Sequence, residues 1–129
     1  MNKINLIGRV LEAYNRQTQQ SLFNDIQIQI NSAVDGYLFP VVSVNSAYTM
    51  SLNDCLILGD ATSAGFTITL KPAGECKQKL VIIKKTNSAN TITIDGDGSE
   101  TIDGATTQSL TTQYSVLRLM SDGTKWHIV

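Results

Sequence analysis

The chain has 129 residues and a mass of 14.0 kDa, which is the usual size of one domain. It carries 10 Lys and Arg residues against 11 Asp and Glu, so its net charge of −1 lacks the basic excess that binding to a phosphate backbone requires, and we expect no nucleic-acid partner. No apolar run approaches the ~20 residues of a membrane-spanning helix, so we also expect no membrane insertion.

The first segment has the apolar spacing of a helix. Apolar or aromatic residues recur every three or four positions along one side. These residues are Ile4, Ile7, Leu11 and Tyr14. With Asn2 as a suitable N-cap, the spacing predicts a helix over residues 3–20. Because its apolar side is thin, this helix is marginal alone in water. The four residues are therefore predicted to form an anchoring or oligomerisation seam, among three copies or against another protein.

The next segment changes period. Residues 25–31 alternate strictly between polar and apolar side chains, which predicts a strand with one buried face. Turn residues follow at 33–36, and Pro40 restricts any strand that passes through it to a sheet edge. We therefore expect residues 1–40 to form an N-terminal helix with a linker or strand, and residues 41–129 to form a β module.

Short β-like runs separated by turn residues make up the rest of the chain. The runs are Val41–Val44, Cys55–Leu58, Phe66–Leu70, Leu80–Lys84, Thr91–Ile94, Ser115–Met120 and Lys125–Val129. They predict a mainly β fold after the N-terminal α-helix, either an antiparallel β-sandwich or roll or a trimeric β-prism. No internal repeat of fixed period is convincing, so a solenoid is not favoured.

One run is apolar on both faces. Residues 80–83 read Leu-Val-Ile-Ile without alternation, which indicates either a central strand or a face covered by another subunit. We predict that Val81 and Ile83 line a subunit interface. The adjacent Lys84-Lys85 doublet is interpreted as a pair of polar residues that flank this apolar strand.

Catalytic and metal-binding patterns do not emerge, and we expect no enzyme activity, cofactor or metal. The single histidine, His127, is predicted to be exposed and inert, since no nucleophile stands in a recognisable context. The acidic loop from Asp95 has Glu100 and Thr106 where a calcium loop needs glycine and glutamate, so it is interpreted as a turn. Cys55 and Cys76 are expected to be free thiols, because no signal peptide is evident and an unexported chain folds in a reducing compartment.

Four motifs in the last two-thirds of the chain follow one another in a characteristic order. They are Phe66–Ala73 (FTITLKPA), Leu80–Ile94 (LVIIKKTNSANTITI), Gly98–Gly104 (GSETIDG) and Ser121–Val129 (SDGTKWHIV). Together they resemble a β module of tailed-bacteriophage head-fibre, decoration and tail-fibre proteins. The chain departs from similar modules at Cys55, Cys76 and His127, which leaves the motifs themselves intact.

The resemblance implies a non-enzymatic virion component, typically a homotrimer, made in the bacterial cytoplasm and docked on capsid or tail proteins by its N-terminal segment. Because only about 40 residues precede the β module, a head fibre or capsid decoration protein is favoured over a receptor-binding tail fibre. The alternative is a tail-associated receptor- or carbohydrate-binding module with a host-surface glycan as its partner. A polysaccharide hydrolase is the least favoured, because its two carboxylates would have to come from turns.

Overall fold

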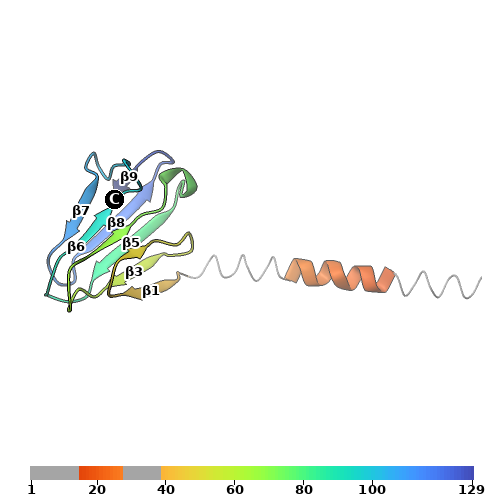
Figure 1. Cartoon of the computed structure of the whole chain (residues 1–129). Coiled ribbons are helices and arrows are strands. Elements are labelled where there is room, and N and C mark those ends of the chain that lie inside the picture. The colour runs from red at the N-terminus through yellow and green to blue at the C-terminus, as the bar shows by residue number, and fades with distance from the viewer. Residues whose placement is uncertain (1–14, 28–38) are drawn as a thin grey trace, which may run out of the picture. The chain divides into compact units, whose positions relative to one another are not determined.

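The computed structural model describes residues 15–27 and 39–129 (Figure 1). The chain divides into two units, residues 1–38 and residues 39–129. Residues 15–27 form a helix in the first unit, and the second unit contains nine strands. In its described part the protein is therefore mainly β with one N-terminal helix, as the sequence predicts at this coarse level.

The helix corrects the prediction for the segment after residue 20. The alternating pattern predicts a strand over residues 25–31, whereas residues 25–27 are helical. Leu22 and Ile26 have the i, i+4 spacing of one helix face, and Nε2 of Gln20 donates a hydrogen bond to Oδ1 of Asn24 at 3.1 Å. Such pairs stabilise a helix and override a short alternation. Residues 28–31 lie outside the described part, as does the predicted seam of Ile4, Ile7, Leu11 and Tyr14.

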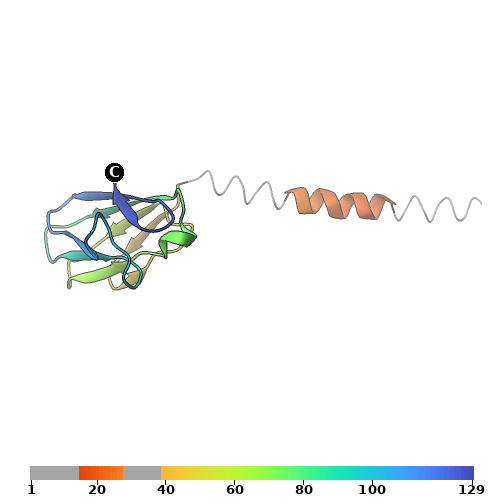
Figure 2. The ribbon, with the colours of Figure 1, turned by 90° about the horizontal axis from the view of Figure 1, so that it is seen from above.

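The strands of the second unit form two sheets. They are β1 (Val41–Val44), β2 (Tyr48–Thr49), β3 (Leu56–Gly59), β4 (Phe66–Thr69), β5 (Leu80–Lys85), β6 (Ile92–Asp95), β7 (Thr107–Leu110), β8 (Val116–Ser121) and β9 (Trp126–Ile128), with a short 3₁₀ turn at Ala73–Glu75. The first sheet has the order β1-β3-β5-β8-β9 and the second the order β2-β4-β6-β7. Figures 1 and 2 show them as two layers in a sandwich-like arrangement.

The chain winds between the two layers rather than folding into hairpins. From β1 to β6, successive strands alternate between the sheets, and the neighbours within each sheet are parallel. Only β7, β8 and β9 pair antiparallel with their neighbours. The predictions of an antiparallel fold and against a solenoid are thus wrong for the first six strands. Leu56 pairs with Ile82 and Phe66 with Ile92, both at a separation of 26 residues, but the preceding turn of the chain is shorter. Because successive turns of the chain differ in length, the sequence shows no repeat of fixed period.

The core lies between the sheets and is built from the inward side chains of both. Ile57 and Leu119 of the first sheet and Ile68 and Ile92 of the second have no exposed surface, and neither has Trp126. Burial of several such side chains, at about 1.5–3 kcal/mol each, is the main stabilising contribution.

Val81 and Ile83 belong to this core, and their predicted role is corrected. Both side chains are fully buried within the single chain, so they have no surface to offer to another subunit. The two-sided apolar run of β5 instead reflects its central position in the five-stranded sheet.

The outward side chains give the two sheets opposite surfaces. On the first sheet, the outward positions that alternate with the buried ones are mostly apolar, and Ser43, Lys84, Arg118 and His127 lie among them. The apolar ones are Val41, Leu56, Leu58, Leu80, Ile82, Val116 and Met120, and we call this surface the apolar face. The outward residues of the second sheet are mainly hydroxyl-bearing. They are Thr49, Thr67, Thr69, Thr93, Asp95, Thr107 and Ser109, and we call this surface the hydroxyl face.

A buried cation organises one end of the fold. Lys85 has no exposed surface, and its Nζ donates to the backbone oxygens of Asn87 and Ala89 and to Oδ1 of Asn87. These bonds fold the β5–β6 loop around the ammonium group and replace its lost water. The interpretation of the Lys84-Lys85 doublet as polar residues around the apolar strand therefore fails for Lys85, which is buried, whereas Lys84 points outward.

Candidate functional site

The helix presents an apolar stripe to solvent. Leu22, Phe23 and Ile26 are 57%, 60% and 54% exposed, and their i, i+3 and i+4 spacing puts them on one side of the helix. A helical segment as short as residues 15–27 is marginal in water without packing. We call these three residues the helix stripe. Its chemistry is that of a surface which binds another protein surface.

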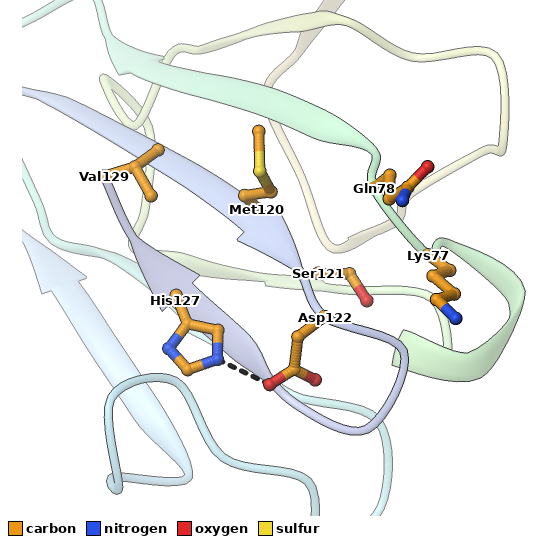
Figure 3. A pocket seen from close by; sticks show the side chains of 7 residues that line it. All are labelled: Lys77, Gln78, Met120, Ser121, Asp122, His127 and Val129. Atoms are coloured by element: carbon orange, nitrogen blue, oxygen red, sulfur yellow. Dashed lines mark hydrogen bonds and ion pairs between the residues drawn. The ribbon is translucent and has the colours of Figure 1, made fainter.

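The β module has a pocket at one end of the apolar face (Figure 3). Its volume is about 410 Å³, within the range of small-ligand pockets. The lining residues are Lys77, Gln78, Met120, Ser121, Asp122, His127 and Val129. The lining thus combines two apolar side chains with a lysine, an amide and a hydrogen-bonded His–Asp pair.

His127 is held by two carboxylates. Its Nε2 lies 2.7 Å from Oδ2 of Asp122, and its Nδ1 lies 3.7 Å from Oδ1 of Asp103. The bond from His127, followed by one from Thr124, holds the pKa of Asp122 well below its usual range. Oδ1 of Asp103 also accepts a hydrogen bond from the backbone N–H of Ile128 at 3.2 Å. These contacts fix β9 to the turn before it and to the loop around Asp103.

The serine of the pocket cannot complete a catalytic triad in this arrangement. Ser121 is 1% exposed, and its hydroxyl donates to the carbonyl oxygen of Ala73 at 2.7 Å. Its oxygen also accepts the backbone N–H of Gly123 at 3.0 Å. Ser121 pairs with Trp126 in the β8–β9 ladder, whereas His127 pairs with Met120, so the serine and histidine alternate to opposite faces of the sheet. Because the proton of Ser121 points to a backbone oxygen, His127 is not placed to remove it.

Neither cysteine has the environment of a nucleophile. Both are free thiols in the structure. Cys76 is 2% exposed, and burial raises the pKa of its thiol, which disfavours the reactive thiolate. The Cys55 thiol donates a weak hydrogen bond to the backbone oxygen of Asn53.

The acidic residues of the turns serve local structure. Oδ1 of Asp60 accepts hydrogen bonds from the backbone and the hydroxyl of Thr62, and Oε2 of Glu100 accepts the backbone N–H of Ala73 at 2.8 Å. No group of three or more His, Cys, Asp or Glu side chains within residues 15–27 and 39–129 is arranged to hold a metal ion. Within the same ranges, no helix is long and apolar enough to cross a membrane.

Sequence reasoning missed the partnership of His127 with Asp122. The signal was present, because Ser121-Asp122-Gly123 is a turn between two β-like runs, and a tight hairpin brings the residues on either side of it together. His127 is half-exposed, with 40% of its side chain accessible, and its contact with Asp122 connects β9 to the turn that precedes it.

Comparisons of the chain with protein-family models, with curated proteins and with solved structures gave no match.

Proposed function

We propose that the chain is a non-enzymatic structural protein of a tailed-phage virion, a homotrimeric head fibre or capsid decoration protein that docks on the particle by its N-terminal segment. The observation that carries the proposal is the helix stripe. Leu22, Phe23 and Ile26 are all more than half exposed on a helix that forms part of a unit separate from the β module.

An exposed stripe of this kind is the pattern of a helix that binds in an apolar groove or packs with copies of itself. In the β module, the carboxylates of Asp54, Asp60 and Glu100 accept hydrogen bonds from backbone N–H groups, which suits a structural part better than a reaction site. The order of the four motifs supports the assignment to the virion class.

The experiment that tests the location uses particles purified from the lysate of cells that produce the chain. A gold-labelled antibody against the protein should decorate the head or the tail in electron micrographs. Protein found only in the particle-free fraction would overturn the proposal.

The docking role is tested with a full-length variant in which Leu22, Phe23 and Ile26 are all replaced by Ser. We expect this variant to keep the fluorescence of the buried Trp126 but to be absent from particles. The matched control replaces Gln17 by Ser, because this residue lies on the opposite side of the helix. If the stripe variant still joins particles, the docking surface lies elsewhere.

A second candidate function, a tail-associated receptor- or carbohydrate-binding module, is favoured by the pocket beside His127. Its size and its mixture of apolar and polar groups suit a small ligand such as one or two sugar rings. Glycan-array binding that is lost in Gln78→Ala and Lys77→Ala variants would support this candidate, and an array without binding would remove it.

A further inference from the structure

We infer that the pocket beside His127 binds a sugar that carries a carboxylate, with the ammonium group of Lys77 as the partner of that carboxylate. This inference rests on the second candidate function, because it names the ligand class of the same pocket. It does not depend on the assignment to a virion.

Two segments that are far apart in the sequence form the pocket. Met120 and His127 belong to β8 and β9, and Val129 follows β9, whereas Lys77 and Gln78 come from the turn before β5. Figure 3 shows this turn on the side of the pocket opposite His127 and Val129. A ligand in the pocket therefore contacts both segments at once.

The turn is fixed against the end of β8 by backbone contacts. Gln78 has a left-handed backbone with a φ of 65°, and its N–H donates a hydrogen bond to the carbonyl oxygen of Ser121 at 2.9 Å. The stem of Lys77 lies over Gly123, since a Cβ at this glycine would be 3.3 Å from Cγ and Cδ of the lysine. Strained residues such as Gln78 cluster at binding sites, where the strain serves to place side chains.

Lys77 and Gln78 offer hydrogen-bonding groups that the chain does not use. In the part of the chain that the structure describes, no carboxylate forms an ion pair with Lys77, and the side-chain amide of Gln78 has no hydrogen-bond partner. The lysine thus supplies an unpaired positive charge at the pocket. The glutamine supplies an amide that can both donate and accept.

The carboxylate of Asp122, which also lines the pocket, already has its own donors. Its Oδ1 accepts hydrogen bonds from the backbone and the hydroxyl of Thr124, both at 2.8 Å, and from the backbone N–H of Lys125 at 3.0 Å. Its Oδ2 lies 2.7 Å from Nε2 of His127. Because both oxygens of Asp122 are engaged within the hairpin, the charge that remains for a ligand is the positive charge of Lys77.

The rest of the lining indicates that the anionic group belongs to a sugar ring. Met120 and Val129 are 39% and 59% exposed, and their apolar side chains suit the C–H face of a ring. The amide of Gln78 suits the hydroxyl groups at the edge of the ring. An inorganic anion would leave the apolar side of the pocket uncovered, whereas an acidic sugar of the uronic or sialic acid type carries all three features in one molecule.

The test compares three methyl glycosides with the same ring: the glucuronide, its uncharged methyl ester and the glucoside. Each is titrated into the full-length protein and followed by the methyl NMR signal of Met120, with the fully buried Met50 as the internal reference. The glucuronide should bind about tenfold more tightly than the other two, because it alone offers a charged acceptor to Lys77. This preference should decrease as the salt concentration rises.

The variant Lys77→Met keeps most of the side-chain stem and removes the charge, so it should bind the three sugars equally. The matched control is Lys125→Met, which removes a lysine of the β8–β9 turn that does not line the pocket, and it should keep the preference. Equal binding of the three sugars by the wild type, or a preference that survives in Lys77→Met, would overturn the inference and leave the second candidate function in place. If no sugar shifts the Met120 signal, the inference also fails, and the glycan array then decides the second candidate function separately.

Discussion

The hydroxyl of Tyr48 donates a hydrogen bond of 2.8 Å to Oδ2 of Asp54, which also accepts the backbone N–H of Ser51 at 2.7 Å. Asp54 is only 7% exposed, so these two donors replace the water that its carboxylate has lost. The bond closes the loop between β2 and β3.

Tyr48→Phe should therefore lower the free energy of unfolding by about 1–2 kcal/mol, because a buried carboxylate loses one of its donors. Urea titration followed by Trp126 fluorescence measures the change, with all proteins at the same chain concentration. Tyr114→Phe is the control, since Tyr114 is 63% exposed and the variant keeps the ring that Lys84 contacts. Equal stability of the wild type and Tyr48→Phe would show that water replaces the hydroxyl.

The same tyrosine predicts an alkaline limit of stability. Burial, and then the bond to Asp54, raise the pKa of Tyr48 from 10.0 to about 12. A pKa that is higher in the folded chain means that the folded chain holds this proton more tightly, so the stabilisation is complete below pH 10 and is lost as the pH rises toward 12. The stability difference between the wild type and Tyr48→Phe should shrink over this range in urea titrations. A difference independent of pH would contradict the assignment.

The sequence predicts strands where apolar content is high and fails where it is low. Val41–Val44 is predicted with the bounds of β1, whereas β2 has only two residues and β7 reads Thr-Gln-Ser-Leu with a single apolar side chain. The direction of pairing is lost for a different reason. Turn residues such as Gly59-Asp60 have the same composition whether the next strand pairs with the preceding one or crosses to the opposite sheet. The turn sequence therefore does not predict whether the two strands form a hairpin.

The pocket and the sheet surface beside it depend on long-range placement in the same way, because Lys77 and Gln78 are far in the sequence from Met120 and His127, which line the same pocket. The alternation of Leu80-Val81-Ile82-Ile83 between inside and outside does not follow from composition, because all four side chains are apolar. Only the register with β3 and β8 shows that Ile82 faces outward and Val81 and Ile83 inward.

Lys85 gives a direct test of the buried cation. Lys85→Met removes the buried donor that holds the backbone oxygens of Asn87 and Ala89 and should destabilise the fold by about 1–3 kcal/mol, because the β5–β6 loop loses the hydrogen bonds that fold it around the ammonium group. Lys84→Met is the matched control and should cost less than about 1 kcal/mol, the value of its contact with the Tyr114 ring. Chemical unfolding compares the two variants. Similar losses would mean that the β5–β6 loop does not depend on the ammonium group.

The His127–Asp122 pair predicts a loss of stability in acid. The pKa of Asp122 is lowered in the folded chain, chiefly by its bond to His127, so its contribution is present above the unfolded value of 3.8 and disappears as the pH falls below it. The melting temperatures of the wild type and Asp122→Asn should therefore differ at pH 7 and converge toward pH 2.5. Asp97→Asn, at an exposed turn position, should follow the wild type at both pH values. If the difference in melting temperature between the wild type and Asp122→Asn does not change with pH, the effect of the substitution does not come from the charge of Asp122.

Gly59 tests how closely the two sheets approach each other. It is the last residue of β3, fully inside the fold, and a Cβ at this position would collide with the side chain of Ile92 on β6. Although Gly59 stands directly before a turn, it therefore also belongs to the packing between the two sheets. Gly59→Ala should destabilise the protein by about 1–3 kcal/mol, because the added methyl group overpacks the space between the sheets. This is the reverse of the usual effect, since alanine is normally the more favourable of the two residues inside a strand. Gly74→Ala is the control, because the added Cβ makes only an ordinary contact with the backbone oxygen of Gly123. If Gly59→Ala is as stable as the control in urea, Ile92 can move aside, and the double variant Gly59→Ala with Ile92→Val should then give no further gain.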